Sequence, residues 1–203
     1  MTRRETLRSG LDAITNDHVP LRDHAALIAA LAKRHPHSIV VEETRHSAGF
    51  NCFAYALGLH TWPTYRNVAE TEAKNGGKQF FASSRFAAWL VAGDLLAPVS
   101  LKTVVAGDLA LYGIAPALYH AARFRGAGRL ESKWGNGHLY EHGLWEVPAR
   151  YGNHARFYRA PSLAVAKRAF AAWISTHEDW PGFVRNRGLP ADLIAPDADA
   201  WLA

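Results

Sequence analysis

The sequence has very little sulfur, with one cysteine, Cys52, and one methionine in 203 residues. A single cysteine excludes an intrachain disulfide and any metal site built from several cysteines. Long hydrophobic runs are also missing, since no stretch approaches the roughly 18 apolar residues of a transmembrane helix. The basic start of the chain is not followed by an apolar run, so no secretory signal peptide is predicted. We therefore expect a cytoplasmic protein, and export by a signal-independent route stays open.

The composition indicates a folded protein. Apolar residues make up 49% of the chain, charged residues make up 20%, and there are seven tryptophans. These values exclude a disordered or collagen-like chain. A chain of this length buries roughly 70% of its extended surface, so its core needs no covalent staple. We expect one domain over residues 1–203, with a core over about 38–160, a helical N-terminal extension over 1–37, and a C-terminal helix and tail over 161–203.

Hydrophobic periodicity places helices first, strands next and a helix last. Asn51 is the natural N-cap of one short helix and Gly58 its stop. Residues 60–80 are expected to form a long surface loop, and the last twenty residues an irregular tail. Helices are predicted over residues 21–34, 52–57 and 84–91, and a final helix is capped by Ser162 and ended by Pro181-Gly182. The strands are predicted over residues 38–42, 101–112, 119–124, 129–134 and 154–159. This segregation predicts an α+β fold with an antiparallel sheet.

Positive charge is concentrated in the predicted strands. Between His120 and Ala160 seven lysines or arginines stand against three glutamates, and the chain as a whole carries a net charge of +5. Basic residues spaced along strands can form a face for an anionic protein partner, and a solvated sheet face is the alternative. No nucleic-acid-binding motif is present, so a nucleic-acid partner is not indicated, and neither is a membrane.

Cys52 stands where cysteine chemistry is favoured. It lies in the first turn of a predicted short helix, where unpaired N–H groups and the positive end of the helix dipole favour thiolate over thiol. The same N–H groups can form half of an oxyanion hole. A nucleophilic cysteine needs a base, and His120 begins a downstream strand. The alternative is that Cys52 is a structural residue of the core.

The order of these parts resembles the papain-like cysteine peptidases of the NlpC type and the related CHAP amidases. The corresponding pieces are Asn51-Cys52, the Gly-Asp-Leu strand over 107–112, His120, and the segment 130–134. The resemblance covers about residues 45–160. It implies a papain-like fold, with helices packed on a central antiparallel sheet and an extra C-terminal helix. It also implies a nucleophilic Cys52 and a His120 base, with no cofactor.

The resemblance also implies a third polar residue that orients His120. The family position falls at Ser132, and Glu131 is one residue earlier on the opposite face of the strand. Chemistry favours the carboxylate, geometry favours Ser132, and a bulge near Gly126 or Gly128 would exchange them. His142 is a further alternative for this role. Upstream of Cys52, Asn51 and His46 are candidate substrate or oxyanion residues.

The chain departs from the family around both motifs. The usual Asp-Cys-Ser is Asn51-Cys52-Phe53, and the customary third histidine is absent. The chain looks like a divergent bacterial branch, so peptidoglycan specificity is not carried over. The expected function is a cysteine-dependent amide or ester hydrolase (a peptidase, amidase or deamidase), with a bacterial effector or toxin as one form. Its substrate would be a peptide, a protein or a cell-wall amide.

Two other functions are weighed against this one. The first is an inactive papain-like module that binds a partner through the basic strands. The second is a zinc hydrolase, because His138-Leu-Tyr-Glu-His142 matches the H-x-x-E-H pattern of inverted zinc peptidases. That chemistry needs both histidines on one helix face, and here Gly137 and Gly143 leave barely one helical turn. No metal site is therefore predicted.

Overall fold

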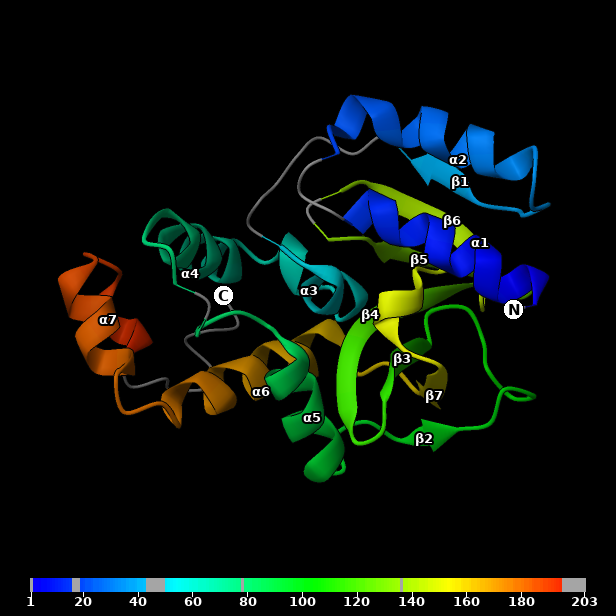
Figure 1. The fold of residues 1–203 in the computed structure, drawn as a ribbon. Coiled ribbons are helices and arrows are strands. Elements are labelled where there is room, and N and C mark those ends of the chain that lie inside the picture. Colours follow the sequence, from blue (N-terminus) through cyan, green and yellow to red (C-terminus); the bar gives the residue numbers. More distant parts are fainter. Residues whose placement is uncertain (1, 16–18, 43–49, 78, 136, 195–203) are drawn as a thin grey trace. The chain divides into compact units, whose positions relative to one another are not determined.

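The computed structural model describes residues 2–15, 19–42, 50–77, 79–135 and 137–194. The chain forms two compact units, and each unit is assembled from two stretches of sequence. Unit 1 comprises Met1–Ser47 and Ala97–Arg159, and unit 2 comprises Ala48–Leu96 and Ala160–Ala203. Among the described residues, the strands lie in unit 1, and the regular structure of unit 2 is helical (Figure 1).

Unit 1 is built on an open antiparallel sheet of seven strands in the order β1-β6-β5-β4-β3-β7-β2. The strands are β1 Val40–Glu42, β2 Pro98–Val99, β3 Leu109–Ile114, β4 Ala117–Gly126, β5 Arg129–Lys133, β6 Leu139–Gly143 and β7 His154–Tyr158. Helices α1 Arg3–Leu11 and α2 His24–Ala32 belong to the same unit, together with the short 3-10 helices η1 Asp12–Thr15, η2 Leu21–Asp23 and η4 Ala149–Tyr151.

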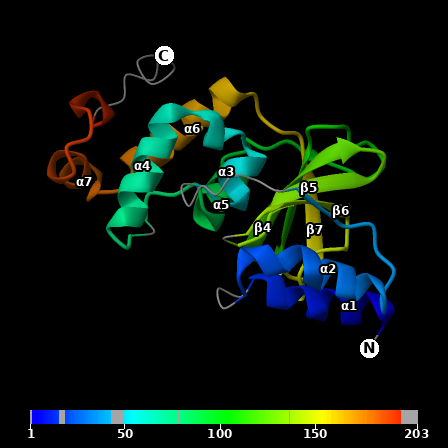
Figure 2. The same ribbon diagram turned by 90° about the horizontal axis from the view of Figure 1, so that it is seen from above.

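One face of the sheet carries the hydrophobic core of unit 1. Successive side chains of a strand alternate between faces, so Tyr112, Ala122 and Leu130 share one face of neighbouring strands. These residues form a buried cluster with Leu11 of α1 and Ile28 of α2. Figure 2 shows α1 and α2 side by side against the sheet. This face is therefore sealed by the N-terminal helices.

A buried arginine fastens α1 to the segment after β6. The guanidinium of Arg8, which is 8% exposed, donates to the carbonyls of Val147 at 3.0 Å and Pro148 at 3.3 Å, and to that of Gly152. A buried cation is tolerated because each of these contacts is a charge-assisted hydrogen bond. Helix η4 is consequently held against the core.

Unit 2 packs its helices around aromatic side chains. Phe170 lies at the centre, with ring centroids 5.1 Å from Tyr65 and 5.4 Å from Phe86. The helices are α3 Cys52–Ala56, α4 Pro63–Lys74, α5 Ser84–Ala92, α6 Leu163–Ser175 and α7 Trp180–Asn186, with 3-10 helices η3 Leu59–Thr61 and η5 Ala191–Leu193. None of the helices in the described part of the chain is long and apolar enough to cross a membrane.

The α+β class is confirmed, and so are several of the local predictions. Asn51 caps α3, and Ser162 accepts a hydrogen bond from the N–H of Val165 at the start of α6. The strand predicted over 101–112 begins too early, because residues 101–103 form a turn and β3 starts at Leu109.

Three other expectations are wrong. The loop over 60–80 contains α4, because Pro63 occupies the first turn of a helix, where its missing N–H costs no hydrogen bond. Strand β6 was not predicted at all. The final helix is not ended by Pro181, because α6 ends at Ser175 and Pro181 lies in the first turn of a separate helix, α7.

Two glycines with positive φ provide a matched test of unit 1. A Cβ on Gly152 (φ 98°) would lie 2.1 Å from the carbonyl oxygen of Gly113, whereas one on Gly126 (φ 105°) would meet nothing within 4 Å. We expect Gly152→Ala to lower the free energy of unfolding by about 3 kcal/mol or more, and Gly126→Ala by about 1–2 kcal/mol. Urea denaturation measures both. Equal losses would show that the backbone at Gly152 relaxes freely.

Candidate functional site

Cys52 is the first residue of α3, which confirms the prediction that it lies in the first turn of a short helix. The Oδ1 atom of Asn51 accepts hydrogen bonds from the N–H groups of Phe53 and Ala54, both at 3.0 Å. Asn51 is therefore a helix cap, and it engages two of the first-turn N–H groups. Cys52 is partly exposed and is in no disulfide.

Tyr65 is a neighbour of Cys52 that the sequence did not single out. Burial raises the pKa of its phenol well above the ordinary range, and the charge of the Cys52 thiolate raises it further. The two groups are thus close enough to interact electrostatically within unit 2. The phenol oxygen accepts a hydrogen bond from the N–H of Ala82 at 3.4 Å. Because the phenol stays neutral, its own proton can be donated. No local pattern in the sequence marks this residue.

Aromatic rings surround the start of α3. His60 lies with its ring centroid 4.9 Å from Tyr55 and 5.2 Å from Phe50. His60 is a second residue that the sequence did not single out, and it belongs to the same unit as Cys52. His46, a candidate oxyanion residue, lies outside the described residues.

His120 belongs to unit 1 and lies within its core. It pairs with Tyr112 across β3 and β4, and its ring stacks on Tyr151 with centroids 3.9 Å apart and planes 3° apart. The side chain is fully buried, and neither ring nitrogen has a hydrogen-bond partner among the described residues. Burial lowers the pKa of His120 well below its ordinary value, and the nearby charge of His142 lowers it further. His120 is therefore neutral at pH 7.

Ser132 shares the sheet face of His120 but hydrogen-bonds a different histidine. Its Oγ lies 2.8 Å from Nε2 of His142 and accepts a hydrogen bond from the indole N–H of Trp134 at 2.9 Å. Nδ1 of His142 lies 2.9 Å from the carbonyl of Gly143, so Nδ1 carries the proton. The Ser132 hydroxyl then donates to Nε2. No hydrogen bond joins Ser132 to His120 in the described part of the chain.

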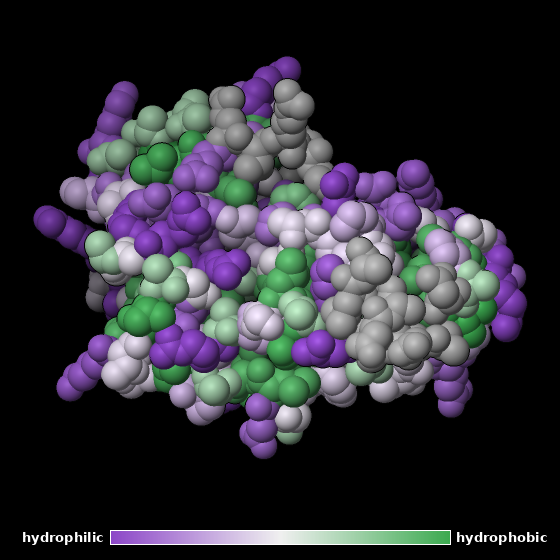
Figure 3. Space-filling view, turned by 180° about the vertical axis from the view of Figure 1, so that it is seen from behind, coloured by the Kyte–Doolittle hydropathy of each residue, from purple (hydrophilic) through white to green (hydrophobic). Residues whose placement is uncertain are grey.

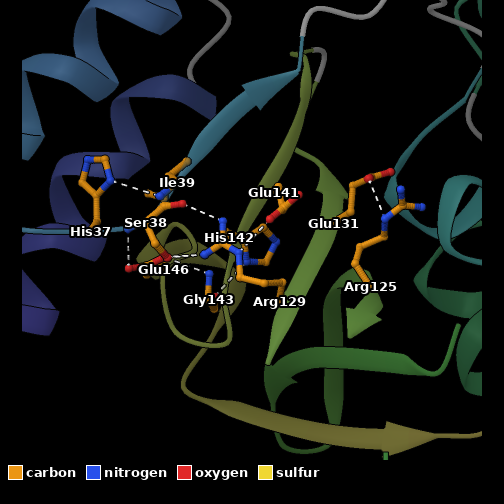
Figure 4. Close-up of polar contacts among 10 residues, drawn as sticks. All are labelled: His37, Ser38, Ile39, Arg125, Arg129, Glu131, Glu141, His142, Gly143 and Glu146. Atoms are coloured by element: carbon orange, nitrogen blue, oxygen red, sulfur yellow. Dashed lines mark hydrogen bonds and ion pairs between the residues drawn. The ribbon is translucent and has the colours of Figure 1, made fainter. Parts of the chain in front are cut away.

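Glu131 lies on the opposite face of the sheet from Ser132, as expected. Strand β4 has an irregularity between Phe124 and Gly126, but Arg123 still pairs with Glu131, so the faces are not exchanged. Figure 4 shows the Glu131 carboxylate beside Arg125, at 3.3 Å. Burial raises the pKa of Glu131 to about 7, and the carboxylates of Glu42 and Glu141 contribute. This carboxyl group therefore titrates near neutral pH.

The H-x-x-E-H segment is not helical. Its last residues form β6, and residues four apart along a strand are separated by about 13 Å. His138 contacts the carbonyl of Leu21 at 3.3 Å, and both nitrogens of His142 lie within the network described above. Among the described residues no group of three His, Cys, Asp or Glu side chains is arranged to hold a metal ion. The helical arrangement that inverted zinc peptidases require is absent from this segment.

Most of the basic residues in the strands contact partners within the chain. Arg159 contacts Asp108 at 3.0 Å, and Arg129 contacts Glu141 at 2.8 Å. Lys133 is buried and donates to the carbonyl of Gly137. Much of the positive charge that the sequence concentrates between 120 and 160 is therefore neutralised or hydrogen-bonded internally.

The fold and these residues define an α+β protein with an open antiparallel sheet and a cysteine at the start of a helix. The chain belongs to the family described as "Domain of unknown function (DUF7689)", whose sequence profile matches residues 41–159. The matched region runs from β1 to β7 and includes Cys52, His120 and Ser132. No curated protein and no solved structure gives a significant match.

The buried network of His142 makes a prediction about pH. Burial lowers the pKa of His142 to about 4, although its contact with the Gly143 carbonyl opposes the shift. The unfolded chain binds this proton near pH 6.5, so the free energy of unfolding falls as the pH drops from 6.5 to 4, by about 3 kcal/mol. We expect His142→Asn, measured by urea denaturation at pH 7, 5.5 and 4, to flatten this dependence. An unchanged slope would show that His142 titrates normally.

Proposed function

We propose that the protein is a cysteine-dependent amide or ester hydrolase of papain-like architecture, in which Cys52 is the nucleophile and His120 the base. The observation that carries the proposal is the partly exposed cysteine at the first residue of a capped helix. The positive end of the helix dipole favours the thiolate at this position. The family match extends over both residues.

The reaction would proceed by acyl transfer. His120 takes the proton of the Cys52 thiol, and the sulfur attacks the carbonyl carbon of the substrate. The carbonyl oxygen becomes an oxyanion, which requires a hydrogen-bond donor at that position. The tetrahedral intermediate collapses as the leaving amine or alcohol receives the proton from His120. Water then hydrolyses the thioester, which releases the acid and restores the thiol.

The state of His120 suits a base in one respect and restricts it in another. The neutral imidazole has no hydrogen-bond partner among the described residues, so a ring nitrogen is open to a proton, but the burial that lowers its pKa makes the ring a weak base until it is exposed. The ring is nevertheless fully buried against Tyr151, so the proposal requires a motion that exposes it. Cys52 belongs to unit 2 and His120 to unit 1, and substitution of His120 tests their pairing.

The first experiment measures the reactivity of the thiol. We expect Cys52 in the folded protein to react with iodoacetamide at pH 6 at least tenfold faster than in the protein denatured in guanidinium chloride, because an ordinary thiol of pKa about 8.5 holds little thiolate at pH 6. Every alkylated molecule reports on Cys52, because the chain has one cysteine. Equal rates would contradict an activated thiol. A p-nitrophenyl ester should also leave its acyl group on Cys52, detected by intact mass, and Cys52→Ala should not be acylated.

The second experiment separates the base from the nucleophile. His120→Phe keeps a flat ring against Tyr151 and removes both nitrogens, so the fold should be retained. We expect the rate of Cys52 alkylation at pH 6 to fall tenfold or more in this variant. His154→Ala, which removes an exposed histidine of β7, should keep the rate of the unaltered protein. Circular dichroism checks that both variants fold. If His120→Phe keeps the reactivity of Cys52, the pairing with His120 is wrong and the nucleophile stands.

A further inference from the structure

A cavity of about 310 Å³ lies in unit 1, between the start of α1 and the segment after β6. Its walls include Arg3 and Arg4 of α1 and Trp145 of the later segment. This volume is at the lower end of the range of small-molecule sites, roughly 300–1,000 Å³. The cavity is formed entirely by unit 1, whereas Cys52 belongs to unit 2, so binding in the cavity is independent of the proposed hydrolase activity.

The cavity is positively charged. Arg3 and Arg4 are exposed, and neither forms a salt bridge with a carboxylate among the described residues. The guanidinium of Arg4 lies 5.7 Å from the centre of the Trp145 indole, and that of the buried Arg8 lies 5.4 Å from it. A guanidinium stacked on an indole loses little further freedom when its planar N–H groups bind a phosphate or carboxylate. Arg8 adds a fixed positive charge close to the same ring.

Glu146 is the one carboxylate among the residues that line the cavity, and other groups of the protein already bind it. Glu146 accepts hydrogen bonds from the N–H and hydroxyl of Ser38, at 2.8 and 2.6 Å, and from the N–H of Gly143 at 2.8 Å. Arg129 lies 3.8 Å away, and Figure 4 shows these groups converging on Glu146. Burial acts to raise the pKa of Glu146, but the hydrogen bonds from Ser38 and Gly143 lower it overall. This carboxylate is therefore ionised, and both of its oxygens already accept hydrogen bonds from the protein.

The remaining walls are flat or apolar. Leu7 is buried beneath the cavity, and His35 and Pro36 border it. Trp145 is itself held in place by an edge-to-face contact with the buried Tyr112, at 6.1 Å. Figure 3 shows the molecule from behind the view of Figure 1, with hydrophilic and hydrophobic residues interspersed over that surface. The cavity thus combines two arginines with an indole, an imidazole and a proline ring.

We propose that this cavity binds a mononucleotide, with the phosphate held by Arg3 and Arg4 and the base packed between Trp145 and the His35-Pro36 wall. Arginine forks match the geometry of phosphate oxygens, and every nucleobase has a face that packs on aromatic rings. A bare anion would use the arginines alone. An uncharged ring would use the walls alone.

The experiment titrates AMP, adenosine and inorganic phosphate into the ¹⁵N-labelled full chain and follows the indole N–H signal of Trp145, assigned by its loss in Trp145→Phe. We expect AMP to shift this signal saturably and to bind at least tenfold more tightly than inorganic phosphate or adenosine. The double variant Arg3→Ala/Arg4→Ala should weaken AMP binding at least tenfold, and Arg4→Lys should weaken it less. Arg66→Ala, which removes an exposed arginine of α4 in unit 2, is the matched control and should bind normally.

The three ligands and the variants separate the parts of the proposal. If AMP and inorganic phosphate bind equally, the ring walls contribute nothing and the mononucleotide assignment is wrong. If AMP causes no shift, or if the double variant binds as the unaltered protein does, the site itself is wrong. Thermal melts of the unliganded variants establish that the exposed arginines can be removed without unfolding, so that lost binding reports on the cavity.

Discussion

Unit 1 depends on the buried guanidinium of Arg8. This side chain reaches from α1 to three backbone carbonyls on either side of η4, more than a hundred residues later in the chain. Removing it would take a charged donor from these carbonyls, of which that of Pro148 also accepts a hydrogen bond from the N–H of Tyr151 at 3.2 Å. A buried carbonyl left without a donor costs more than the hydrogen bond itself contributes. Two features follow from this clamp: Tyr151 of η4 is placed against His120, and Trp145 is placed against the arginines of α1.

The same core determines how its histidines behave. His120 and His142 lie on one face of the sheet beneath α1 and α2, and burial makes the neutral imidazole the stable form of both. His142 satisfies both nitrogens through Ser132 and Gly143, whereas His120 has a stacked ring and no hydrogen bond among the described residues. The hydrogen bonds of His142 meet the usual requirement that buried polar groups are paired, and His120 does not meet it among the described residues. The difference between the two singles out His120 as the one whose burial needs a functional explanation.

Local patterns predicted the elements whose signals lie in neighbouring residues. The cap at Asn51, helix α6 after Ser162, and the hairpin of β4 and β5 were all found from periodicity and turn residues. Strand β6 was missed because Gly137 and Gly143 enclose only five residues, rich in histidine and glutamate, that suggest a metal motif. Alternation also assigned Ser132 and Glu131 to opposite faces correctly. It could not show which face α1 and α2 would seal, because that depends on contacts between distant segments such as Arg8 and Val147.

The candidate site shows the same division between local and distant information. Cys52 could be predicted because a helix start is a local feature, whereas Tyr65 could not, because only the fold of unit 2 brings its phenol near the thiol.

Which charges are free to bind a partner depends on contacts between distant residues. Seven basic residues between 120 and 160 suggested a binding face, but most of them contact carboxylates or carbonyls of this chain. Arg3 and Arg4 are among the basic residues that have no carboxylate partner in the described part of the chain, and they lie outside this segment, near the N-terminus. A surplus of arginine in a sequence therefore locates a binding surface only after its internal partners have been subtracted.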